Sequence, residues 1–136
     1  MTENQDYCAE IMRRINSPEH FGGRNGILIT EFGDGWAKGE MENSKATQNQ
    51  MGGVHGGALS TLADIVAAMS VSTMGRRRRV TLHNTMHYMR QACPGKLSCE
   101  AHVRKTGRTI AVSEATVMDA DGAKVAIGTF TFYFTE

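Results

Sequence analysis

The chain is poor in the features that would mark several special classes of protein. Its 136 residues include only two prolines and three cysteines, and its longest charge-poor stretch is a poor candidate for a membrane span. Because Cys8, Cys93 and Cys99 are odd in number and form no Cys-x-x-Cys pair, they predict neither a disulfide framework nor a structural zinc site. They fit a reducing, cytoplasmic compartment. The polar, acidic beginning of the sequence also lacks the character of a secretory or transit peptide.

What remains is the composition of an ordinary globular domain. Hydrophobic residues make up 40% of the chain and charged residues 21%, which excludes disordered and fibrous classes. A chain of 136 residues is long enough to bury one core. We therefore expect a single domain over residues 1–136, with an N-terminal helix and turn in residues 1–25 and the core in residues 26–136.

Charge is unevenly placed along the chain. The formal net charge is only +1, yet residues 75–108 hold nine Lys or Arg and a single acid, Glu100. Four consecutive arginines occupy residues 76–79. This segment predicts either an anionic partner or a solvated face that acidic neighbours balance.

Hydrophobic periodicity predicts two helices, over residues 4–16 and 56–74, and six strands. Leu59, Leu62 and Val66 form an apolar stripe on the second helix, and Gly75 is a plausible stop. Short turns between the later strands indicate an antiparallel sheet, which must curl around the long apolar helix to cover it. The order predicts an α+β hotdog fold, an antiparallel sheet wrapped around one long central helix. The expected strands are residues 27–32, 36–42, 79–89, 96–105, 109–119 and 124–134, with a loop over 43–54.

Asp64 is the residue that most needs an explanation. Histidine aside, it is the only charged side chain between Lys45 and Arg76. A helical wheel places it well away from the apolar stripe and so predicts that it points away from the sheet. Its neighbours on that face are small and mostly apolar, which indicates a face covered by another surface rather than by water. A carboxylate buried there is costly unless it has partners or a function. These neighbours are Ser60, Ala67, Ala68 and Val71.

The start of the same helix is glycine-rich, with Gly56 and Gly57 following His55. Its first N–H groups lack intrahelical partners and lie at the positive end of the helix dipole, which suits a carbonyl oxygen that gains negative charge. A phosphate-binding loop is excluded because its characteristic spacing is missing. His83 and His87 have no acidic or cysteine partner at ligand spacing, so we expect no metal site.

Spacing relates these two features. Gly56 and Asp64 are eight residues apart, or about 12 Å along the axis of one helix. A general base acts within about 3 Å of the water that it deprotonates. One copy of the helix therefore cannot supply both groups to one carbonyl, whereas two antiparallel copies related by a two-fold axis can, giving two equal sites per homodimer.

The motif Asn49-x5-His55-Gly56-Gly57-x6-Asp64 resembles that of the PaaI-like hotdog-fold acyl-CoA thioesterases. Residues 81–89 resemble the third strand of this family, and residues 103–109 resemble the basic hairpin that follows it. The resemblance covers about residues 26–134. It implies hydrolysis of an acyl-CoA thioester to a free acid and CoA, with no metal or organic cofactor.

The resemblance also implies a role for each site residue. Asp64 would be the general base for water or the nucleophile, and the Gly56 N–H would polarise the thioester carbonyl. His55 would shape that turn, Asn49 would position the thioester or water, and Thr81 would orient the water. The family takes the Asn, His and Gly from one subunit and the acid from the other, and its members are often tetramers built as dimers of dimers.

The basic segment then has an anionic partner in CoA, whose phosphates suit Arg and Lys. We expect Arg104, Lys105 and Arg108 to bind these phosphates, with the arginines of residues 76–79 as weaker candidates. Neither the acyl group nor the role of residues 76–79 follows from the sequence.

Three other functions remain as alternatives. One is a non-catalytic hotdog domain that binds acyl-CoA without turnover. A nucleic-acid binder acting through residues 76–79 is disfavoured, because the arginines lack interleaved aromatic residues or a recognition helix. A hotdog hydratase or dehydratase would need an acid and a histidine at a different spacing. We expect neither nucleic acid nor membrane as a partner.

Overall fold

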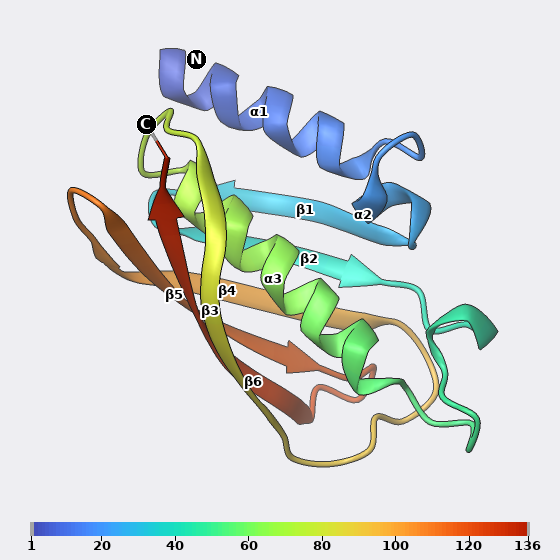
Figure 1. Cartoon of the computed structure of the whole chain (residues 1–136). Coiled ribbons are helices and arrows are strands. Elements are labelled where there is room, and N and C mark those ends of the chain that lie inside the picture. Colours follow the sequence, from blue (N-terminus) through green and yellow to red (C-terminus); the bar gives the residue numbers. More distant parts are fainter. Residues whose placement is uncertain (1, 136) are drawn as a thin grey trace.

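The computed structural model describes residues 2–135, which form a six-stranded antiparallel sheet curled around one long helix (Figure 1). This arrangement confirms the predicted α+β hotdog fold. In chain order the elements are α1 (Glu3–Asn16), α2 (Phe21–Arg24), β1 (Ile27–Gly33), β2 (Trp36–Met41), the short 3₁₀ helix η1 (Lys45–Thr47), α3 (Gly56–Ser72), β3 (Arg79–Tyr88), β4 (Leu97–Thr106), β5 (Ile110–Met118) and β6 (Lys124–Phe134).

The sheet has the strand order β1-β2-β4-β5-β6-β3, so β1 and β3 are its two edges. All neighbouring strands are antiparallel. Strand β3 directly follows α3 in sequence but pairs with the C-terminal strand β6, with Arg79 opposite Phe134. The chain thus places β3 beside the central helix and leaves the other side of the strand without a neighbour in residues 2–135.

Helix α3 buries one stripe against the concave face of the sheet. Leu62, Val66 and Met69 are fully buried, as the periodicity predicts. The approach is close enough that a β-carbon on Gly39 of β2 would lie 2.8 Å from Val66 Cγ2. Glycine at that position therefore lets the strand and the helix pack in contact.

Helix α1 lies over the β1 edge of the sheet and runs alongside α3 (Figure 1). The Asn16 side chain fixes its end, because its amide donates to Ile29 O at 2.9 Å and its oxygen accepts from Ile29 N at 2.7 Å. The turn expected between the first helix and residue 26 contains the four-residue helix α2. Its glycines allow close packing, since a β-carbon on Gly23 would collide with Ser17 O.

Most predicted boundaries lie within one residue of those in the structure, and two larger differences remain. The helix expected over residues 56–74 ends at Ser72, because the N–H of Thr73 already bonds to the carbonyl of Ser70, three residues back. The loop expected over residues 43–54 contains η1, which Ser44 caps. None of the helices in residues 2–135 is both long and apolar enough to cross a bilayer.

Candidate active site on helix α3

The turn that leads into α3 is held by its own side chains. Asn49 closes it, because its Oδ1 accepts hydrogen bonds from the N–H groups of Met51 at 2.9 Å and Gly53 at 3.2 Å. Gly52 sits at the sharpest point with φ +88°, a conformation that L side chains rarely adopt. These contacts fix the direction of the backbone before the first residue of α3.

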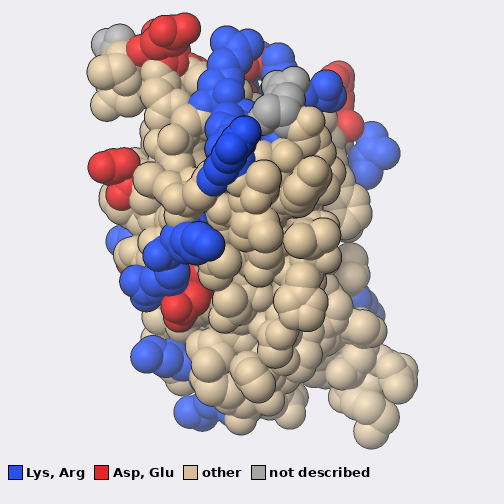
Figure 2. Space-filling model, turned by 60° about the vertical axis from the view of Figure 1, so that its left-hand side comes forward, with Lys and Arg blue, Asp and Glu red and all other residues tan. Residues whose placement is uncertain are grey.

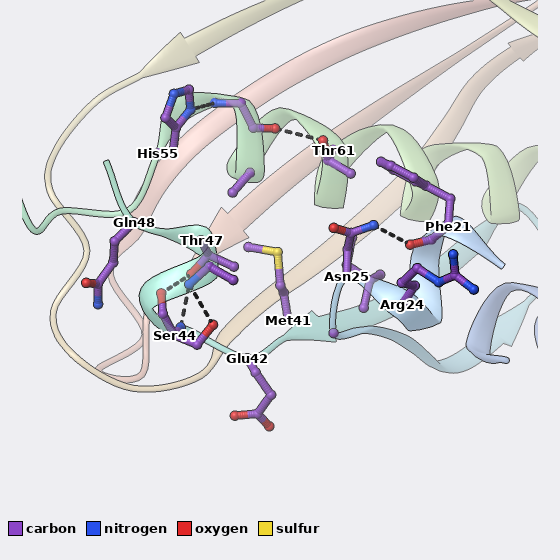
Figure 3. A pocket seen from close by; sticks show the side chains of 15 residues that line it. Phe21, Arg24, Asn25, Met41, Glu42, Ser44, Thr47, Gln48, His55 and Thr61 are labelled. Atoms are coloured by element: carbon purple, nitrogen blue, oxygen red, sulfur yellow. Dashed lines mark hydrogen bonds between the residues drawn. The ribbon is translucent and has the colours of Figure 1, made fainter. Parts of the chain in front are cut away.

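His55 caps the N-terminus of α3. Its Nδ1 accepts a hydrogen bond from the Gly57 N–H at 2.8 Å, so a neutral ring carries its proton on Nε2 (Figure 3). The N–H of Gly56 has no acceptor among residues 2–135. It is a free donor at the positive end of a seventeen-residue helix.

The ring of Tyr88, at the end of β3, lies beside this donor. A β-carbon added to Gly56 would make an ordinary 3.5 Å contact with Tyr88 Cε1. The Tyr88 side chain is itself 52% exposed. An aromatic wall and a free N–H therefore border the same surface.

Asp64 lies half-buried about two turns further along α3. The Thr81 hydroxyl of β3 donates a 2.8 Å hydrogen bond to its Oδ1. Burial raises the pKa of the Asp64 carboxyl above its ordinary value, and the hydrogen bond from Thr81 acts in the opposite direction. Such a carboxylate is a stronger base than one in water.

This contact corrects the predicted direction of Asp64. The side chain does lie away from the buried stripe, but it faces the edge strand β3, because the sheet curls far enough to reach the side of the helix. The small residues beside it are also covered partly by the chain itself. Ala67 and Val71 are buried within residues 2–135, whereas Ser60 and Ala68 are only half-buried.

The candidate site residues therefore form two groups on one helix. Asn49, His55 and Gly56 gather at its N-terminus, and Asp64 with Thr81 lies about 12 Å away along the axis. Within one chain the structure does not bring the two groups together. Among residues 2–135, no three His, Cys, Asp or Glu side chains are grouped to hold a metal ion.

Two of the four arginines of residues 76–79 are engaged within the fold, whereas Arg76 and Arg78 are exposed. The Arg77 guanidinium stacks 3.7 Å from the Phe134 ring centroid and donates to Gly107 O and Arg108 O at 3.2 and 2.5 Å. Arg79 donates to Ala68 O at 2.6 Å and to the Ser72 hydroxyl. Arg77 and Arg79 thus hold β3 against the β4–β5 hairpin and the helix.

The other basic candidates lie on or beside the β4–β5 hairpin, at the end of the sheet far from Gly56 (Figure 1). Arg104 pairs with Glu114 at 3.2 Å. Lys105 and Arg108 are exposed and form no salt bridge with residues 2–135.

Two cavities on the outer side of α3 were not predicted from the sequence. The first, of about 440 Å³, adjoins His55 and Gly57 and is closed by α2 and η1 (Figure 3). The second, of about 390 Å³, lies between α1 and α3. The one sequence feature that relates to these cavities is the glycine pair of α2, which lets that helix pack closely. The second cavity is lined by Ile11, Arg14, Ile15, His20, Phe21, Gly22, Ile65, Ala68 and Arg79.

Known proteins share both the sequence pattern and the fold. A family model described as the thioesterase superfamily matches residues 51–126. A conserved protein, PA5202 of Pseudomonas aeruginosa, is 31% identical, with a TM-score of 0.82 over 90% of this chain and 97% of that one. A hypothetical thioesterase of Streptococcus pneumoniae, solved with coenzyme A, is 26% identical, with a TM-score of 0.75 over 80% and 85%. Zebrafish thioesterase superfamily member 2 is 25% identical, with a TM-score of 0.80 over 91% and 93%. A comparison with curated proteins found no match.

Proposed function

We propose that this chain, which belongs to the thioesterase superfamily, hydrolyses an acyl-CoA thioester to the free acid and CoA. The observation that carries the proposal is the arrangement of α3, on which a half-buried carboxylate held by Thr81 follows a free N–H at Gly56. Thioester hydrolysis needs both a base for water and a donor for the oxyanion. The Streptococcus pneumoniae relative, solved with coenzyme A, supports a CoA derivative as the substrate.

The chemistry uses two groups. The Asp64 carboxylate takes a proton from water as the water oxygen attacks the carbonyl carbon. The Gly56 N–H donates to the oxyanion that forms, at the helix terminus where negative charge is favoured. The carbon–sulfur bond then breaks, and the proton on Asp64 passes to the CoA thiolate. In the alternative route the same carboxylate attacks the carbonyl itself and expels the CoA thiolate to form a mixed anhydride, which water then hydrolyses to the free acid and the restored Asp64 carboxylate.

The supporting residues keep the roles that the resemblance implies. Thr81 holds the Asp64 carboxylate by its hydroxyl and would orient the attacking water. The Oδ1 of Asn49 is occupied by backbone N–H groups, which leaves its Nδ2 to position the thioester. Structures of alanine variants of the Streptococcus pneumoniae protein, one at an aspartate and one at a threonine, concern the same two residue types as the Asp64–Thr81 pair.

A complete site needs two chains. Since Gly56 and Asp64 are about 12 Å apart on one rigid helix, one carbonyl can meet both only if the second group comes from a partner. A two-fold axis that places two α3 helices antiparallel would set Gly56 of each chain against the partner's Asp64. The homodimer would hold two equal sites, and two such dimers would form the expected tetramer.

The bare edge of the sheet is the surface best suited to this pairing. Eight of the ten residues of β3 are exposed, among them the apolar Val80, Leu82 and Tyr88. From residue 80 to residue 89 the chain carries no Lys, Arg, Asp or Glu. The side of the molecule that carries β3 accordingly shows a broad uncharged area, with basic side chains along its upper end and one flank (Figure 2). Because Thr81 ties β3 to α3, edge-to-edge pairing would bring the two helices side by side.

CoA would be held by its phosphates on the hairpin side. Lys105 and Arg108 are exposed and Arg104 is paired only at the surface, so all three remain accessible to an anion. Their hairpin lies at the end of the sheet opposite Gly56, so in the shared site the phosphates would be bound by the chain that supplies Asp64. The three free thiols of Cys8, Cys93 and Cys99 fit the cytoplasmic location expected from the sequence.

The test is hydrolysis of an acyl-CoA series, followed through the release of CoA thiol, with the wild-type chain and Asp64→Ala. We expect the variant to fold and to form the same dimer but to lose at least about 10³-fold in kcat. Wild-type activity retained in Asp64→Ala would refute the mechanism. Tight binding of acyl-CoA by the wild type without turnover would instead identify a non-catalytic binding domain.

A further inference from the structure

The two cavities on the outer side of α3 share one wall, the side chain of Phe21. This ring lines both the 440 Å³ cavity beside His55 and the 390 Å³ cavity between α1 and α3. It lies over α3 close to Thr61 (Figure 3). Apart from this ring, the two spaces have no lining residue in common.

Phe21 stands on a backbone that cannot easily move. Its carbonyl accepts from the Asn25 N–H at 3.1 Å and from Asn25 Nδ2 at 2.7 Å. A β-carbon on the next residue, Gly22, would lie only 3.0 Å from Ile15 O, so α2 is seated tightly on the end of α1. The ring itself is 65% exposed, which is unusual for so large an apolar side chain. The backbone that carries the ring is thus held in place, and the ring stands between the two spaces that it lines.

The cavity between α1 and α3 lies next to Asp64, the catalytic base proposed above. Ile65 and Ala68, on its wall, are one and four residues after Asp64. Two hydrogen bonds join β3 to α3 here: Thr81 donates to the Asp64 carboxylate, and Arg79, two residues earlier on the strand, donates to the Ala68 carbonyl. The part of the cavity wall formed by Ala68 is thus about one helical turn from Asp64 along α3.

The lining favours a hydrocarbon group. The lining is mostly apolar and includes Ile11, Ile15, Phe21 and Ile65, and no acidic residue belongs to it. Both arginines of the lining are engaged in part: Arg14 pairs with Glu10, and Arg79 donates from its terminal nitrogens to backbone oxygens, while its buried Nε has no partner among residues 2–135. An apolar ligand would gain here by leaving water, about fourfold in affinity for each methylene buried.

We propose that this cavity receives the acyl group of the thioester, that the acyl group is an uncharged hydrocarbon, and that Phe21 sets the largest size accepted. The proposal rests on the proposed thioesterase function. Phe21 separates the acyl compartment from the more polar cavity beside His55. Removing the ring joins the two spaces and admits larger acyl groups.

The test compares the wild-type chain, Phe21→Ala and Phe21→Trp on straight-chain acyl-CoAs from butanoyl to hexadecanoyl and on benzoyl-CoA. We expect kcat/KM in the wild type to rise with chain length and then fall once the cavity is full. Phe21→Ala moves the maximum to longer chains and gains at least about tenfold on the substrates beyond it. Phe21→Trp moves the maximum to shorter chains. Leu28→Ala, which removes a 44% exposed side chain from the far edge strand β1, is the matched control and leaves the profile unchanged.

Identical profiles in all four proteins would overturn the proposal while leaving the hydrolase function intact. A second chain, rather than an acyl group, would be the occupant if Phe21→Ala changed the dimer dissociation constant in sedimentation experiments without changing the profile. Should the wild type hydrolyse no acyl-CoA, the proposed function fails, and calorimetry still decides the role of Phe21. Dissociation constants of the same acyl-CoAs that differ between the wild type and the position-21 variants would support the proposal. Equal constants would overturn it.

Discussion

The Thr81 hydroxyl reaches from edge strand β3 to the Asp64 carboxylate in the middle of helix α3, at 2.8 Å. This one hydrogen bond links the element that ends in the exposed sheet edge to the residue proposed as the base. It also partly offsets the effect of burial on the Asp64 pKa. Changes at position 81 should therefore alter the pH dependence of the reaction.

Thr81→Val removes the hydroxyl and keeps the shape of the side chain. Since that hydroxyl stabilises the charged form of Asp64, its loss raises the Asp64 pKa further. The base is active when deprotonated, so the acidic limb of the kcat/KM profile moves to higher pH. Thr81→Ser keeps the donor and should leave the limb in place. A limb that stays fixed in both variants would mean that Asp64 is not the group that titrates.

Gly56→Pro deletes the proposed oxyanion donor with little disturbance of the fold. Position 56 is the first helical residue, where proline is favoured, and the preceding His55 already has the extended φ −67°, ψ 134° that a following proline requires. We expect kcat to fall by about 10²–10³-fold at nearly unchanged Tm.

Gly56→Ala is the control for the added carbon atoms. It keeps the N–H, and its β-carbon meets Tyr88 at an ordinary distance of 3.5 Å. Its activity should stay within a few-fold of wild type. Equal losses of kcat in the two variants would show that the added volume at position 56, and not the loss of the amide hydrogen, lowers the activity.

Sharing of the site between chains predicts complementation. Homodimers of Gly56→Pro and of Asp64→Ala each lack one required group at both sites. In a mixed dimer, one site combines the intact Gly56 of one chain with the intact Asp64 of the other. Co-expression of the two variants with different affinity tags should therefore restore about one working site per mixed dimer. Mixed dimers as inactive as their parents would place both groups within one chain.

Lys105 and Arg108 should act on the nucleotide part of the substrate only. The double replacement by alanine removes two exposed cations, so we expect KM for acyl-CoA to rise about tenfold while Tm is unchanged. Acyl-pantetheine, which lacks the phosphates, should be hydrolysed equally well by both proteins. Arg77→Ala serves as a contrast, because loss of its contacts with Phe134 and Gly107 should lower Tm. A KM that rises equally for both substrates would argue against phosphate binding at this hairpin.

Asp64→Asn should stabilise the fold as it abolishes activity. In the folded chain burial raises the Asp64 pKa above its ordinary value of 3.8, so the folded state binds more protons than the unfolded state between the two values. Stability from this group is full below 3.8 and is lost as the pH rises through the folded pKa. At neutral pH the amide, which can still accept from Thr81, avoids the cost of a buried charge, and Tm should rise by about 2–5 °C. The gain should shrink as the pH is lowered, and a lower Tm at neutral pH would contradict the argument.

The sequence predicts the repetitive parts of this fold well and its packing less well. The stripe of Leu62 and Val66 locates α3, since helical periodicity is local in the chain. Helix α2 escapes prediction because the glycines that suggest a break are needed for contact with α1.

The site is predicted in the same uneven way. The turn that His55 shapes lies within a few adjacent residues, but the meeting of Asp64 with Thr81 depends on how far the sheet curls. A helical wheel cannot describe that curvature. The run of residues 76–79 suggests a basic surface, whereas Arg77 and Arg79 are engaged with Phe134 and the end of α3 because partners distant in sequence lie against them.

Strand β3 has one further consequence for the behaviour of the chain in a cell. Its outer backbone groups have no strand partner within residues 2–135, and most of its side chains lack charge. A chain that satisfies these groups only by joining a copy of itself is less stable when dilute, because association and folding are linked by mass action. At low concentration, newly made copies would then expose the unpaired edge of β3, with which a strand of another protein could pair. The rate of synthesis, as well as the chemistry on α3, would decide how much working protein accumulates.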